Sequence, residues 1–235
     1  MKPPARPVKA SLRQQGYDEI KRRILDSHYA PGTILSENQL AEELQIGRTP
    51  VREALRDLAG GGLVQIMPQR GVMVTQLTLH DIVEVYQLRE QLECFAVRLA
   101  ALQMTPEDAA GMQADHARAV SSMTRGRLRE AYDHSVLLHH RLITLARNSR
   151  LTQFMGQLGD QVHRFGLLTL RNGRASTALD EHAAIIAALL KGDGPEAEDL
   201  MRRHLRADRA MVLRLTLPAS LPDDAARLEL EHVLA

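Results

Sequence analysis

Apolar residues recur at helical spacing in three short segments near the start of the chain. The first, residues 17–25, keeps its apolar side chains on one helical face and stops before the sequence APG at 30–32. The second, SENQLAEEL at 36–44, opens with a serine followed three positions later by a glutamine, the spacing of a capping box. In the third, RTPVREALRDLA at 48–59, proline lies in the first turn and glycines follow the last turn. The pattern predicts three helices.

The period then changes from helical to alternating over LVQIMPQRGVMVTQL at 63–77. Val64 and Ile66 on one side, and Val72 and Val74 on the other, predict two short β-strands. They are joined by a turn that contains proline, arginine and glycine. Helix, helix, turn, helix and β-hairpin is the element order of a winged helix-turn-helix domain.

From His80 onward the pattern is helical, with the main interruptions at 105–108, 171–177 and 191–196. Aromatic residues make up only 3% of the chain, so aliphatic side chains and methionine must pack this region, as in a helical bundle. We therefore predict a mainly α fold, an N-terminal winged helix-turn-helix plus a C-terminal all-helical bundle. The expected parts are a flexible leader, the winged domain, the helical domain and a tail, at residues 1–10, 11–78, 79–215 and 216–235.

The overall charge does not decide for or against a nucleic-acid partner. The 235 residues contain 30 Lys and Arg against 29 Asp and Glu, a formal net charge of +1, so any basic surface must be local. Such an excess occurs in residues 1–23, which hold seven basic and two acidic side chains. The single cysteine, Cys94, excludes an intramolecular disulfide, and no apolar run approaches the ~20 residues that span a bilayer. With no N-terminal signal segment, we expect a cytoplasmic protein without a membrane partner.

The third predicted helix carries the side chains that a recognition helix needs. In a helix-turn-helix, the second helix of the motif enters the major groove with its N-terminal residues at the base edges. Arg48 and Arg52 share a face, and arginine pairs bidentately with guanine, while Thr49 can bond a phosphate. Arg70, at the tip of the hairpin, can reach a phosphate or the minor groove. An arginine-rich helix that binds nothing carries the same charges, and the element order is what favours DNA.

The apolar stretch SVLLHHRLI at 135–143 predicts one helix with two adjacent histidines, which point about 100° apart. His139 shares the drier line of that helix and is predicted to point inward, whereas His140 faces solvent. His182 and His204 also lie on apolar faces of two later helices. Three inward histidines on three helices can bind a divalent metal, but each can also be a hydrogen-bonded core residue.

Two parts of the chain resemble known families. Residues 32–74, most specifically RTPVREAL, resemble the winged-helix domain of the GntR family. Residues 80–215 resemble the FCD ligand-binding domain of the FadR subfamily. The stretches that carry this second resemblance are VYQLREQLECFAVRLAA (85–101), LHHRLITLARNSRL (138–151) and EHAAIIAALLKGDGPEAEDLMRRHL (181–205). The resemblance implies a transcriptional regulator whose helical domain binds an effector. A two-fold dimer is expected from the need to span two half-sites, and the apolar excess of residues 80–101 can supply the contact.

For the winged domain, the resemblance implies DNA contacts at Arg48, Thr49, Arg52, Arg70 and Gly71. The sequence departs from the family at Gly47, where serine is usual. Glycine is a tolerated N-cap that costs only a few tenths of a kcal/mol against serine. A hydroxyl that could bond a phosphate is nevertheless missing at this position.

For the helical domain, the resemblance implies a metal held by an aspartate and a histidine four residues apart, plus histidines from two later helices. His182 and His204 match the later pair, and alignment on Asn148 gives His139 as the first histidine. Ser135 then occupies the aspartate position, so either water or effector completes a three-histidine site or the metal has been lost. We expect a divalent metal, zinc first, with nickel or manganese as alternatives.

Arg89 resembles the family's inward arginine that grips an effector carboxylate, which the guanidinium fork matches with two parallel bonds. Its other interpretation is a salt bridge to Glu93, four residues on. The two are compatible, because Glu93 can orient Arg89. Ser135 and His163 are further expected effector contacts. Arg164, next to His163, is expected to line the same cavity.

Together these observations predict a ligand-responsive transcriptional regulator that binds a palindromic double-stranded operator as a homodimer, with a small organic or sugar acid as effector. Two alternatives stay open: a regulator without metal, and a metalloenzyme with an appended DNA-binding domain. Against the enzyme, HExxH is absent and Glu181 points away from its neighbour His182. We therefore expect no enzymatic activity, and residues 216–235 have no assigned role.

Overall fold

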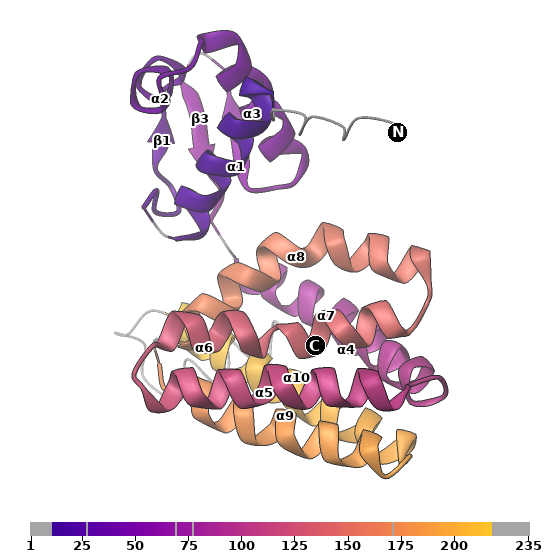
Figure 1. Cartoon of the computed structure of the whole chain (residues 1–235). Coiled ribbons are helices and arrows are strands. Elements are labelled where there is room, and N and C mark those ends of the chain that lie inside the picture. Colours follow the sequence, from indigo (N-terminus) through magenta and orange to yellow (C-terminus); the bar gives the residue numbers. More distant parts are fainter. Residues whose placement is uncertain (1–10, 27, 69, 77, 171, 218–235) are drawn as a thin grey trace, which may run out of the picture. The chain divides into compact units, whose positions relative to one another are not determined.

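The computed structural model describes residues 11–26, 28–68, 70–76, 78–170 and 172–217. It divides between Leu77 and Thr78 into two compact units, each of which is described by itself (Figure 1). The predicted fold class is confirmed, since the described residues are mostly helical with one small sheet near the N-terminus. The expected leader, 1–10, and all of the expected tail beyond residue 217 lie outside the described residues.

The first unit has the predicted order of three helices and a hairpin, together with one further strand. Its elements are α1 (Leu12–Leu25), β1 (Ile34–Leu35), α2 (Glu37–Leu44), α3 (Arg48–Gly60), β2 (Val64–Met67) and β3 (Gly71–Val74). The sheet is antiparallel with the order β1-β3-β2. Only β1 was not predicted, because two residues are too few to establish an alternating pattern.

The turn between α2 and α3 differs in one detail from the sequence expectation. Ser36 is the N-cap of α2, but its side chain makes no capping hydrogen bond, so the predicted capping box is wrong. At the other end of α2, Gln45 adopts a left-handed conformation with φ 53°, which turns the chain toward α3. Gly47 then caps α3 in an extended conformation.

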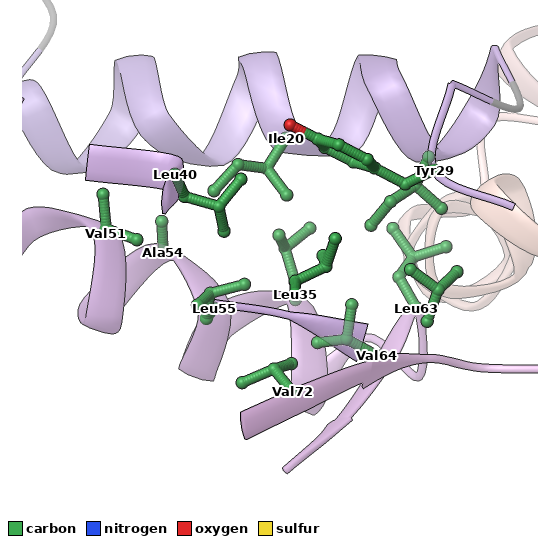
Figure 2. Close-up of a cluster of buried hydrophobic side chains, with 13 residues drawn as sticks. Ile20, Tyr29, Leu35, Leu40, Val51, Ala54, Leu55, Leu63, Val64 and Val72 are labelled. Atoms are coloured by element: carbon green, nitrogen blue, oxygen red, sulfur yellow. The ribbon is translucent and has the colours of Figure 1, made fainter. Parts of the chain in front are cut away.

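The core of the first unit lies between α1, α3 and the sheet. Figure 2 shows Ile20 of α1 and Leu40 of α2 pointing toward Leu55 of α3, with Val64 and Val72 of the strands below them. All five side chains are at most 5% exposed. Burying side chains of this kind contributes about 1.5–3 kcal/mol each, so this apolar centre fixes the position of α3 against α1 and α2.

The second unit consists of helices joined by short connections. They are α4 (Leu79–Ala101), α5 (Pro106–Thr124), α6 (Leu128–Ser135), α7 (Leu137–Leu145), α8 (Ser149–Leu170), α9 (Arg174–Leu190) and α10 (Gly194–Thr216). The stretch expected as one helix at 135–143 is divided at Val136, so Ser135 ends α6 and His139 belongs to α7. None of the helices in the described part of the chain has the length and hydropathy needed to cross a bilayer.

Helix α4 is the central element of this unit. It begins with a complete capping box between Thr78 and Asp81, and it packs along α10 and against α7 and α8 (Figure 1). Its buried residues Val97 and Ala100 join Ile185 of α9 in one apolar cluster. This packing brings α4, α7, α9 and α10 close enough for their polar residues to meet in the interior.

Gly71 provides a test of the sheet geometry. Its φ is +103°, and a Cβ atom there would lie 3.0 Å from the backbone oxygen of Leu35 on β1. We expect Gly71→Ala to cost about 1–3 kcal/mol of local stability and to speed hydrogen–deuterium exchange of residues 64–74. Gly32→Ala is the matched control, since its φ is +83° but its Cβ would meet only the flexible end of Gln76. Equal exchange in both variants would contradict the prediction.

Candidate functional site

Three histidines from three helices meet inside the second unit. His139 comes from α7, His182 from α9 and His204 from α10, with ring centroids 4.6 to 5.3 Å apart. The Nε2 atom of His182 is 3.2 Å from Nε2 of His139 and 3.3 Å from Nε2 of His204. One nitrogen of each ring therefore faces a common centre, and these ligand atoms lie within 4.8 Å of one another.

Carboxylates hold the outer nitrogens of two of the rings. Nδ1 of His139 is 2.5 Å from Oε2 of Glu93, and Nδ1 of His204 is 2.7 Å from Oε2 of Glu181. Because a carboxylate only accepts, both Nδ1 atoms carry the proton, and in the neutral form of such a ring Nε2 keeps a lone pair directed at the centre. The Nε2 atom of His182 carries at most one hydrogen, so it can donate to the lone pair of only one of the other two rings. At least one lone pair is therefore left for a cation.

This donor set fits a divalent metal ion. Three imidazole nitrogens with an open position suit zinc, and a carboxylate on the far nitrogen fixes the tautomer of a metal-bound histidine. Burial lowers the pKa of His139. Burial also lowers the pKa of His182 strongly, and the neighbouring rings of His204 and His139 add to this effect. Both His139 and His182 are therefore neutral near pH 7, the form that binds metal.

Arg89 belongs to the same polar cluster, and its side chain is only 6% exposed. Its Nε donates to Oε1 of Glu93 at 2.7 Å, and its guanidinium carbon lies 5.0 Å from the centre of the Tyr86 ring. Burial opposes the charge of Glu93, yet Arg89 and His139 hold the pKa of that carboxyl well below its usual range. The salt bridge uses Nε, so the two Nη atoms take no part in it.

A cavity of about 360 Å³ lies beside the histidine cluster, within the size range of small-ligand pockets. The three histidines, Arg89, Ser135 and His163 all line it. Arg164 is buried but is not among the described lining residues, so the expectation for Arg164 is wrong. The rest of the lining is largely apolar, as at Met123, Ile143, Met155, Val162, Leu170 and Leu179.

Arg174 is also buried, and its place in this cluster was not predicted from the sequence. Its Nη2 is 2.5 Å from Oε2 of Glu181, and its Nε is 3.0 Å from Oδ1 of Asp208. Arg174 is the first residue of α9 and lies within the interruption that the sequence shows at 171–177. Nothing in that stretch indicates that an arginine is buried. Glu181 contacts His204 instead of its sequence neighbour. For Asp208, the available signal was its position four residues after His204 on an otherwise inward face.

The predicted DNA contacts lie at the N-terminus of α3 and in the turn between β2 and β3. Arg48 and Thr49 are exposed in the first turn of α3. Arg52, one turn later, pairs with Glu37 of α2, with Nη2 2.8 Å from Oε2. Arg70 is exposed in the β-turn, just before Gly71. The structure thus brings three of the five residues together on α3 and places the other two in the hairpin.

Two family models match the chain. The model described as "Bacterial regulatory proteins, gntR family" matches residues 12–74, which span α1 to β3. The model described as "FCD domain" matches residues 84–207, which include all three clustered histidines.

Curated relatives cover most of the chain at 25–30% identity. The HTH-type transcriptional repressor RspR of Escherichia coli (strain K12) is 29% identical, over 86% of this chain and 88% of that protein. An uncharacterized HTH-type transcriptional regulator in an unstable DNA locus of Streptomyces ambofaciens is 30% identical, over 91% of both chains. The probable D-xylose utilization operon transcriptional repressor of Paenarthrobacter nicotinovorans is 29% identical, over 85% of this chain and 88% of that protein.

Solved structures share the fold. E. coli McbR/YncC is similar with a TM-score of 0.75 at 21% identity, over 87% of this chain and 98% of that chain. A transcriptional regulator from Rhodococcus sp. RHA1 is similar with a TM-score of 0.73 at 24% identity, over 87% of this chain and 99% of that chain. These likenesses extend through both units of the chain.

Glu93 provides a test of the buried cluster. Glu93→Gln removes the negative charge shared by buried Arg89 and His139, and we expect it to lower the free energy of unfolding by about 3–5 kcal/mol. Urea unfolding of the full chain, followed by circular dichroism, measures this. Glu84→Gln is the matched control on the same helix, where the side chain is 59% exposed, and should change stability by less than about 0.5 kcal/mol. A Glu93 variant as stable as the Glu84 variant would refute the central role of this charge.

Proposed function

The chain belongs to the GntR family of bacterial regulatory proteins and carries an FCD domain, and from this premise we propose that a small carboxylate bound in its helical unit controls operator binding by its winged unit. Relatives that match at least 85% of this chain are described as transcriptional repressors. The observation that carries the proposal is that three clustered histidines and Arg89 line one cavity.

On the DNA side, α3 is the proposed recognition helix. Arg48 and Thr49 are exposed at its N-terminus, the part of a recognition helix that meets base edges. The pairing of Arg52 with Glu37 holds that guanidinium beside the same end of α3 before DNA arrives. We propose that Arg48 and Arg52 read bases, that Thr49 and Arg70 contact the backbone, and that Gly71 shapes the wing.

A homodimer follows from the proposed operator. One winged unit spans a single half-site, so a palindrome requires two copies related by a two-fold axis. Effector control then means that the ligand binds the DNA-competent arrangement of the two winged units with a different affinity from the other arrangement.

On the effector side, we propose that His139, His182 and His204 hold a divalent metal, zinc in the first place. A metal bound there supplies a Lewis acid for the oxygens of a carboxylate. Arg89 would bind the same carboxylate from the other side through its Nη atoms, and Ser135 and His163 would contact the rest of the ligand. The apolar lining at Met123, Met155 and Val162 favours a compact organic acid with some hydrocarbon surface.

The DNA half of the proposal is tested by a double substitution. Duplexes selected from a randomised library by the full chain should contain a palindrome, and binding should weaken as salt rises. Arg48→Ala with Arg52→Ala should weaken binding to the selected duplex at least tenfold, since each bidentate pair contributes about 1–3 kcal/mol. Arg22→Ala, an exposed arginine of α1, is the control and should change binding less than threefold. If the selected duplexes shared no common sequence, the proposal of sequence-specific operator binding would be wrong.

The effector half is tested by metal content and thermal shift. The purified chain should contain about one divalent metal per protomer, and small organic or sugar acids should raise its melting temperature when metal is present. His182→Ala should lose the metal and the acid-induced shift but keep binding to the selected duplex. Stabilisation by acids that persists after chelation would favour histidines that bond the effector directly. Loss of duplex binding in His182→Ala would instead indicate a role of the site in folding.

A further inference from the structure

Asp208 lies one helical turn after His204 on α10, next to the histidine cluster. Its Oδ2 atom is 3.6 Å from Nε2 of His204, the nitrogen that also lies 3.3 Å from the His182 ring. The side chain is 17% exposed and lines the cavity. A carboxylate oxygen is therefore present beside the lone pairs that remain for a cation.

The spacing matches that of two ligands on one ion. Ligands bound at about 2.0–2.2 Å with angles of about 90–110° lie about 3–3.5 Å from each other. The two Nε2 separations of 3.2 and 3.3 Å fall in this range, and the 3.6 Å between His204 and Asp208 is just above it. Oδ2 must also approach the other two rings, which rotation about the two side-chain bonds of Asp208 allows.

Arg174 holds Asp208 in a suitable orientation. Its Nε is 3.0 Å from Oδ1, so that oxygen faces the arginine while Oδ2 faces His204. Through Nη2 the same arginine bonds Glu181, which accepts from Nδ1 of His204. One buried cation thus orients two carboxylates around a single ring, as the outer partners of metal ligands commonly do.

Ser135 is poorly suited to the role that its position implies. A serine hydroxyl is neutral and a weak ligand for zinc, which takes its oxygen ligands from carboxylates. Ser135 also ends α6, whereas His139 lies on α7 beyond the break at Val136. A carboxylate is present instead on α10, at Asp208.

We propose that Asp208 is the carboxylate ligand of the metal, so that α10 contributes a histidine and an aspartate four residues apart and Ser135 is left to contact the effector. This inference rests on the proposed metal site. It also means that one anionic ligand offsets part of the charge of a divalent ion, and that an effector oxygen would bind as a fifth ligand.

Titration of the metal-free full chain with Co²⁺ and Zn²⁺ tests the proposal, with affinity measured against a chromophoric chelator. Asp208→Asn should weaken binding by about 100-fold or more and change the visible absorption of bound Co²⁺, because an oxygen ligand is lost. Ser135→Ala should leave the metal affinity within twofold of the parent's and the Co²⁺ absorption unchanged. Asp199→Asn, which removes an exposed carboxylate from the same helix, should have no effect.

The outcomes separate this inference from the function on which it rests. If neither the parent nor any variant binds metal, the metal site fails and the inference fails with it. If His182→Ala loses metal but Asp208→Asn binds as the parent does, only the inference is overturned. An Asp208→Asn variant with weaker binding but an unchanged Co²⁺ spectrum would place Asp208 outside the coordination sphere, which also overturns it. Unchanged circular dichroism and duplex binding confirm that each variant is folded.

Discussion

Compensation of buried charge is the constraint on which the interior of the helical unit depends. Glu93 is 2% exposed, and an isolated carboxylate at such a depth is strongly disfavoured. It is kept ionised by Arg89 on its own helix and by His139 of α7. Helices α4 and α7 therefore have to stay in register for this charge to remain paired. The apolar packing around them, at Val97 and Ile185 among others, supplies the free energy that holds this arrangement.

The same solution is repeated on the other side of the histidine cluster. Glu181 of α9 is paired with Arg174 and with Nδ1 of His204 on α10. Each carboxylate fixes the proton of one ring on its outer nitrogen, so the inner nitrogens of His139 and His204 are left as acceptors on either side of the His182 ring. A polar chain thus runs from Arg89 through the three rings to Arg174 and Asp208. It connects α4, α7, α9 and α10 along one wall of the cavity.

The fold was largely predictable, because most of its signals are local. Helix periodicity, the glycines after α3 and the alternation in the hairpin are properties of neighbouring residues. The errors occur where tertiary contacts override such signals. Ser36 has the sequence of a capping box but makes no side-chain bond, the helix expected across 135–143 is divided at Val136, and β1 exists only because residues 34 and 35 pair with β3.

The sequence by itself determined the element order, the winged domain followed by a helical one, and which histidines lie on apolar helical faces. Those faces follow from spacing along one helix. Spacing along the chain could not determine that His139, His182 and His204 share one centre, that Glu181 accepts from His204, or that Arg174 and Asp208 lie beside them. Such groupings join helices far apart in the chain, and the packing of α4, α7, α9 and α10 decides which faces meet.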